Sequence, residues 1–97
     1  MTQPILTGAD RRSLRAQGQL LTDLATIGHQ GITDAVKAEV NVQLERHQLI
    51  KVRATELDRN ARKALFEQIA ESSNAALIGT VGRTALLYRP NAAAEEA

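Results

Sequence analysis

The sequence predicts an α/β (α+β) fold, a two-layer sandwich with helices packed on one face of a mixed four-stranded sheet. Helical and strand-like patterns alternate along the chain in the order α-β-α-β-α-β-β. Strands joined through a helix pair in parallel, whereas the last two are joined by a tight turn and are expected to be antiparallel. The 97 residues suffice for one core but not for two. The helices are expected at about 8–19, 33–47 and 59–73, and the strands at about 24–27, 49–54, 76–81 and 84–89.

The first helix is marked by a capping box and a basic stripe. Thr7 and Asp10 have the spacing at which two side chains satisfy free N–H groups at a helix start. Arg11, Arg12 and Arg15 fall within about 100° of one another around the helix. No acidic residue follows any of the three at the third or fourth position, so their potential is expected to face solvent unpaired. The stripe is either a solvated helix face or a surface for phosphate contact.

The segment Ile27-Gly28-His29-Gln30-Gly31-Ile32-Thr33 joins the first strand to the second helix. Glycine at both positions allows a positive φ and the close approach of another backbone. Thr33 is expected to be the N-cap of the helix, whose free N–H groups and positive end would face the loop. The loop is therefore either ordinary turn chemistry or a clamp for a sugar-phosphate backbone.

The second helix and second strand have clear core faces. Val36, Val40 and Leu44 recur at fourth positions and form the expected buried stripe of the helix. Residues 49–54 alternate apolar and basic side chains, which is typical of a half-buried strand. Lys51 and Arg53 are therefore expected to point away from the core.

The third helix and the last two strands complete the fold. Arg59, Arg62 and Lys63 crowd the first turns of the helix. Gly82 and Arg83 separate two strand-like runs, which is typical of a β-hairpin with Arg83 at its tip. We expect residues 1–90 to form a single domain and residues 91–97 to be a disordered tail.

Composition excludes several classes of function. One Phe, one Tyr and no Trp disfavour extensive stacking of unpaired bases. The absence of cysteine excludes disulfides and thiolate metal sites. No apolar run approaches the ~18 residues of a membrane span, and the N-terminus lacks a signal-peptide pattern. We therefore expect a cytoplasmic protein. The net charge is +1, but outside the tail twelve basic residues face nine acidic ones, so the body is mildly basic.

Catalysis is the weakest hypothesis. His29 and His47 are the only histidines, and neither has a partner at metal-ligand spacing. A nuclease would need a metal-binding carboxylate cluster that the sequence does not show. We expect no enzymatic activity, cofactor, metal or small-molecule substrate.

Four separated blocks carry a resemblance to a known family. They are Leu6-Thr7, the IGHQGIT loop, residues 47–52 (HQLIKV) and residues 81–90 (VGRTALLYRP). In this order they resemble the CRM-domain family, the small bacterial YhbY-type RNA-binding proteins. The resemblance covers about residues 6–90. It implies a fold similar to the C-terminal domain of bacterial translation initiation factor three.

The resemblance also implies a function. Family members are expected to bind ribosomal RNA within large ribosomal subunit precursors and to assist ribosome assembly. Their GxxG loop is likened to that of KH domains and corresponds here to Gly28, His29, Gln30 and Gly31. Basic residues of the first helix and Arg83 would support it. The loop departs from the commonest pattern, with Gln30 where Asn is usual and His29 where Lys often stands.

The resulting hypothesis is a monomeric, non-enzymatic RNA-binding module with no membrane partner. The alternative is a protein-docking module of ribosomal particles that makes no direct RNA contact, its basic residues merely solvating the surface. The candidate RNA-binding residues are Gly28, His29, Gln30, Gly31, Thr33, Arg11, Arg12, Arg15, Lys51, Arg53 and Arg83.

Overall fold

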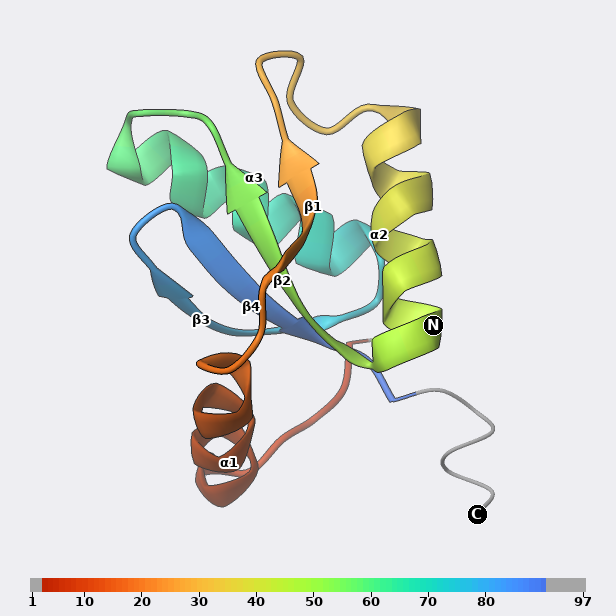
Figure 1. Ribbon diagram of the computed structural model, residues 1–97, viewed down its shortest axis with the longest axis vertical. Helices are drawn as coiled ribbons and strands as arrows, with labels where there is room; N and C mark the ends of the chain where they lie inside the picture. Colours follow the sequence, from red (N-terminus) through yellow and green to blue (C-terminus); the bar gives the residue numbers. More distant parts are fainter. Residues whose placement is uncertain (1–2, 91–97) are drawn as a thin grey trace.

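A mixed four-stranded sheet forms the centre of the computed structural model, which describes residues 3–90 (Figure 1). The elements are α1 (Gly8–Gly18), β1 (Asp23–Ile27), α2 (Asp34–His47), β2 (Leu49–Ala54), α3 (Arg59–Ser72), β3 (Ala76–Val81) and β4 (Thr84–Tyr88). The strand order is β1-β2-β4-β3, with β1 parallel to β2 and β4 antiparallel to both neighbours. The predicted element order, mixed sheet and terminal hairpin are confirmed. The tail predicted for residues 91–97 lies outside the described residues.

Side-chain caps fix the start of each helix. The hydroxyl of Thr7 accepts from the N–H of Asp10, whose carboxylate accepts from the N–H of Thr7, so the predicted capping box is confirmed. Thr33 caps α2 as predicted. Asp58 caps α3 by accepting from the N–H of Ala61 at 2.8 Å.

Helices α2 and α3 cover one face of the sheet and enclose the main core. Val40 and Leu44 of α2 and Phe66 and Ile69 of α3 are almost completely buried. The predicted inward faces of the second helix and second strand are confirmed. The sheet residues of this core are Ala25, Ile27, Ile50, Val52, Ala54, Ala85 and Leu87.

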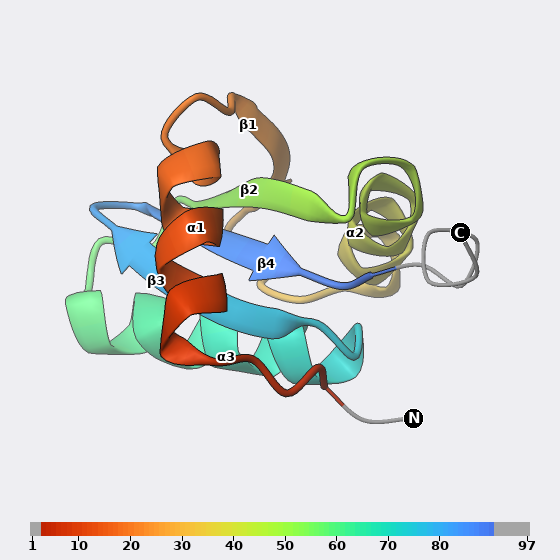
Figure 2. The same cartoon turned by 90° about the horizontal axis from the view of Figure 1, so that it is seen from below.

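Helix α1 packs on the opposite face, so the predicted placing of all helices on one face is wrong. Leu14 joins an apolar cluster whose buried sheet members are Leu49, Ala76 and Ile78. The alternation of apolar and basic residues in 49–54 did not indicate this cluster, because the charged Lys51 and Arg53 lie on the outward side of β2. The molecule has three layers, and Figure 2 shows α1 in front of the sheet with α3 along its lower side.

The close approach of α1 to the sheet depends on Gly18. A Cβ at this position would lie 3.0 Å from Cγ of Leu86 and closer still to its methyl groups. Gly18 is buried at the end of α1. The last turn of α1 can therefore rest on β4 only without a side chain at this position.

Arg89 ties α2 to the end of α3. Its Nη1 donates to Oδ1 of Asn41 and to the carbonyl of Ser73, both at 2.8 Å, and Nη2 donates to the carbonyl of Asn41. The backbone N–H of Arg89 donates to the carbonyl of Gln48. Arg89 therefore has a structural role, although it lies within a block that resembles RNA-binding proteins.

Three loops meet at the end of the sheet where β1 and β2 finish. The backbone N–H of Thr55 donates to the carbonyl of Ile27 at 3.0 Å, and that of Ala54 donates to the carbonyl of Arg83 at 2.9 Å. These bonds bring the GxxG loop, the β2–α3 loop and the β3–β4 hairpin to one end. Among the described residues, no helix combines the length and apolar character needed to cross a membrane.

Candidate nucleic-acid interface

The GxxG loop is a four-residue turn at one extreme of the longest axis of the molecule (Figure 1). The backbone N–H of Gly31 donates to the carbonyl of Gly28 at 3.0 Å, which closes the turn. His29 and Gln30 are its two central residues, and both are exposed. The loop therefore presents its backbone and two polar side chains to solvent.

The two glycines of the loop have different structural requirements. Gly31 has φ +73°, a conformation that favours glycine. Gly28 has no such φ, and a Cβ added there would meet no atom within 4 Å. Of the two properties expected of these glycines, a positive φ therefore holds for Gly31 but not for Gly28. Its missing side chain leaves open space beside the backbone of the turn.

The start of α2 is less available to an anion than the loop is. The N–H of Val36 donates to the hydroxyl of Thr33, and the N–H of Lys37 donates to the Thr33 carbonyl. The first turn also contains the carboxylate of Asp34. Because this carboxylate opposes a phosphate at the same helix end, the loop backbone is the better anion contact.

Two of the basic candidates lie at the same end of the molecule as the loop. Arg53 is exposed in β2, where it neighbours Thr26 of β1 just before that strand runs into the loop. Arg83 is exposed at the hairpin tip, and its backbone bonds to the last residue of β2. The structure thus places Arg53 and Arg83 at the same end of the sheet as Gly28–Gly31.

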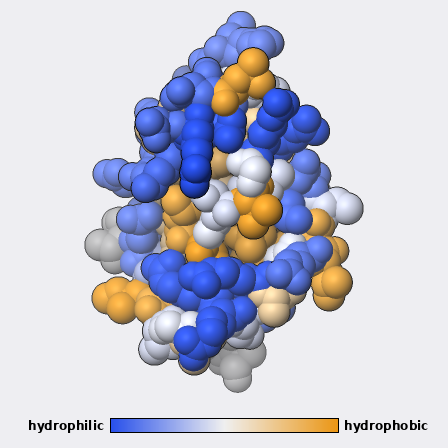
Figure 3. Space-filling model, turned by 90° about the vertical axis from the view of Figure 1, so that its left-hand side faces the viewer, coloured by the Kyte–Doolittle hydropathy of each residue, from blue (hydrophilic) through white to orange (hydrophobic). Residues whose placement is uncertain are grey.

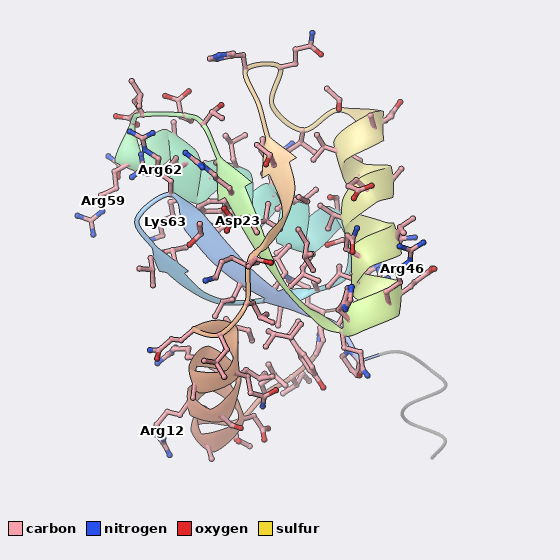
Figure 4. The ribbon with its side chains drawn as sticks, viewed as in Figure 1. Arg12, Asp23, Arg46, Arg59, Arg62 and Lys63 are labelled. Atoms are coloured by element: carbon pink, nitrogen blue, oxygen red, sulfur yellow. The ribbon has the colours of Figure 1, made fainter. Side chains whose placement is uncertain are left out.

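The arginine stripe of α1 lies at the other end of the longest axis (Figure 1). Arg11 donates to the carbonyl of Leu77 at 3.0 Å, and Arg15 donates to the carbonyl of Ile78 at 3.4 Å. These two side chains therefore have partners that were not expected and anchor α1 to β3, although Arg15 is still exposed to solvent. Arg12 is exposed and points away from the sheet (Figure 4).

Arg15 and Lys51 nevertheless share a surface hollow between α1 and the sheet. The hollow has a volume of about 520 Å³ and is also lined by Gly79, Thr80 and Thr84. Lys51 is half-buried, on the same strand face as Arg53. This hollow connects one arginine of the stripe with the outward basic residues of β2.

A second basic cluster was not among the predicted site residues. Arg59, Arg62 and Lys63, in the first turns of α3, line a hollow of about 520 Å³ together with Thr80 and Gly82 (Figure 4). Arg62 also donates to the carbonyls of Glu56 and Leu57, which fixes the β2–α3 loop. In the sequence, this cluster is indicated by the position of its three basic residues at the start of a helix.

The start of a helix disfavours cations, because the positive end of the helix dipole lies there. The first turn of α3 nevertheless contains no acidic residue. The acidic side chains just before the helix, Glu56 and the capping residue Asp58, are fewer than the three basic ones. A cluster placed against the dipole is therefore a candidate anion contact.

The described part of the chain contains no group of three or more His, Cys, Asp or Glu side chains placed to hold a metal ion. The site is an exposed loop, with basic residues of β2, α3 and the β3–β4 hairpin at or beside the same end of the sheet. A comparison with protein families matches residues 6–89 to the CRS1/YhbY (CRM) domain. The chain belongs to the CRM-domain family. The resemblance seen in the four sequence blocks is confirmed.

Relatives of this CRM domain are named as RNA-binding proteins. The probable RNA-binding protein PA4753 of Pseudomonas aeruginosa is 31% identical over 86 residues, which cover 89% of this chain and 83% of the relative. An RNA-binding protein of Haemophilus influenzae is 30% identical, with 89% and 87% covered. The probable RNA-binding protein YqeI of Bacillus subtilis is 29% identical, with 88% of each covered.

A solved structure shares the fold. The solution structure of SAV1595 from Staphylococcus aureus, described as a candidate RNA-binding protein, superposes with a TM-score of 0.81 at 28% identity. The match covers 90% of this chain and 91% of SAV1595. The α+β fold and its mixed sheet are therefore shared with this structure.

Proposed function

We propose that this CRM domain is a non-enzymatic RNA-binding protein that contacts RNA through the GxxG loop and the basic residues beside it. The observation that carries the proposal is the open space at Gly28. No atom of the protein occupies the position of a Cβ there, and the turn does not require glycine by its φ. A glycine that the fold does not need leaves room for a ligand backbone to approach the loop.

The charge around the loop supports an anionic ligand. Residues 53–63 together with Arg83 carry five basic and two acidic side chains, a net +3, whereas the whole chain has a net charge of +1. Positive charge is thus concentrated at the loop end of the molecule. Such a patch attracts phosphate groups without regard to sequence and weakens in salt.

The RNA proposed is ribosomal RNA within large ribosomal subunit precursors, bound during ribosome assembly in the cytoplasm. This finer proposal rests on the resemblance to YhbY-type proteins, since the names of the relatives support RNA binding alone. The protein would act by holding RNA rather than by reacting with it, since the loop end presents backbone and cations.

Protein docking is the second candidate, and exposed apolar side chains favour it. Leu57 is 72% exposed and Val81 is 80% exposed, and both lie in or beside the loops of the same end. Apolar side chains at such exposure can contact a protein partner. This candidate predicts protein contacts and no RNA contacts.

Ultraviolet crosslinking in cells, mapped at nucleotide resolution, distinguishes the two functions. We expect RNA adducts on large-subunit ribosomal RNA, enriched in particles that are still assembling. Ala substitution of Arg59 and Arg83 together should lower the RNA yield about tenfold, because two phosphate contacts are lost. A matched control is Ala substitution of Lys37 and Arg46, which are exposed on α2 and are not among the candidate RNA-binding residues. Protein adducts without RNA adducts would contradict the proposal.

A further inference from the structure

The β3–β4 hairpin is a ridge between the two basic hollows. Thr80 lines both hollows, Gly82 lines the one beside α3, and Val81 and Thr84 line the one beside α1. The hydroxyl of Thr84 donates to the carbonyl of Val81 at 2.9 Å and so braces the turn. Arg83 lies at the tip. A braced hairpin therefore separates the two hollows.

The two hollows have the same volume, and both are basic. Each has a volume of about 520 Å³. Arg59, Arg62 and Lys63 line the hollow on the α3 side, and Arg15 and Lys51 line the one on the α1 side. No carboxylate is among the described residues that line either one. Figure 3 shows the corresponding arrangement, with hydrophilic side chains above and below a less polar central band.

The protein offers few rings for stacking unpaired bases. Phe66 is 1% exposed, and Tyr88 is packed against the α1-side cluster. These are the only Phe and Tyr of the chain, which has no Trp. The imidazole of His29 is the one exposed ring at the tip of the GxxG loop. Recognition of single-stranded RNA relies on several such rings, so this surface favours RNA that is contacted through its backbone.

We infer that the RNA bound by this domain is base-paired, with the β3–β4 hairpin lying in a groove and the two hollows receiving phosphates of opposite strands. The minor groove of A-form RNA is wide and shallow and displays 2′-hydroxyls along its floor. A two-stranded ridge fits such a groove, and Thr80 can hydrogen bond with a 2′-hydroxyl. Arg83 at the tip then contacts the groove floor or its edge. The inference rests on the proposed RNA-binding function and specifies its ligand.

The three lysines of the chain provide a matched test. Lys51 lies in the α1-side hollow, Lys63 lies in the α3-side hollow, and Lys37 is exposed on α2 outside both. Each is replaced separately by Gln, and fluorescence anisotropy is measured with an RNA duplex across a salt series. Lys51→Gln and Lys63→Gln should each weaken binding roughly threefold or more and reduce the salt slope by about one. Lys37→Gln should bind as the unchanged protein does, and Lys51→Arg should restore binding.

An unstructured single strand of the same length serves as competitor, and we expect it to bind at least about tenfold more weakly than the duplex. Equal or tighter binding of the single strand would overturn the inference while leaving the proposed function in place. The inference would also be overturned if the duplex affinity and salt slope of Lys51→Gln or Lys63→Gln equalled those of Lys37→Gln. Binding of neither RNA would overturn both the inference and the proposed function.

Discussion

Gly28 and Gly31 close the same turn, but the fold requires only one of them. Gly31 has φ +73°, which costs another residue strain, whereas Gly28 lies beside open space and has no positive φ. In the sequence the two glycines are equivalent, because the GxxG pattern gives no φ. The structure therefore separates a glycine that shapes the turn from one that leaves it accessible.

Substituting each glycine by Ala tests this difference. Gly31→Ala should lower the free energy of unfolding by about 1 kcal/mol, because a side chain is strained at positive φ. Gly28→Ala should leave the free energy of unfolding unchanged or raise it by up to about 1 kcal/mol, since it restricts only the unfolded chain. The same Gly28→Ala protein should lose RNA affinity about tenfold, or ~1.4 kcal/mol.

Urea unfolding and fluorescence anisotropy measure the two effects on the same samples. A folded Gly28→Ala protein with unchanged RNA affinity would show that the open space at the turn is not used. Equal destabilisation by both substitutions would show that the turn depends on both glycines.

At the scale of elements, α1 is held on the sheet by contacts that the sequence does not display. Arg11 and Arg15 form a stripe on a helical wheel, yet they donate to carbonyls of β3, more than sixty residues away. Helix spacing gives the face of a side chain but not what lies opposite that face. The stripe was therefore predictable, and its partners were not.

The seating of α1 depends on Gly18 and Leu86. Gly18→Ala should destabilise the protein by about 1–3 kcal/mol, because the added methyl overlaps the Leu86 side chain. In the double variant Gly18→Ala/Leu86→Ala, the Leu86 side chain that the added methyl would overlap is gone. The effects of the two substitutions on the free energy of unfolding should therefore be non-additive, with a coupling of about 1 kcal/mol. Thermal unfolding of the two single variants and the double variant measures this coupling. Simple additivity would contradict the close contact between α1 and β4.

At the scale of the whole molecule, the sequence predicted most of the architecture and part of the candidate site. Caps and periodicity placed every helix and strand within one or two residues, because these signals are local. The position of α1 on the second face was not predictable, since it depends on which outward side chains of β3 and β4 meet it. The three basic residues at the start of α3 are evident in the sequence. That they share a hollow with the β3–β4 hairpin depends on the fold and was not predictable.

The arrangement along the longest axis is the basis of the functional account. The GxxG loop lies at one end, whereas α1 lies toward the other (Figure 1). Arg53, Arg83 and the basic residues at the start of α3 lie at or beside the end of the sheet that carries the loop. Of the stripe, only Arg15 reaches a hollow beside the hairpin. RNA contact is therefore centred on the loop end, and α1 mainly covers the second face of the sheet.

Chemical-shift mapping of the backbone amides during titration with an RNA fragment recovered by crosslinking tests this account most directly. We predict the largest shifts at residues 28–31, within 53–63 and at Arg83, with small shifts along the exposed face of α2. Shifts confined to α2, or to the hollow near Leu20, Leu24 and His47, with residues 28–31 unchanged, would contradict it.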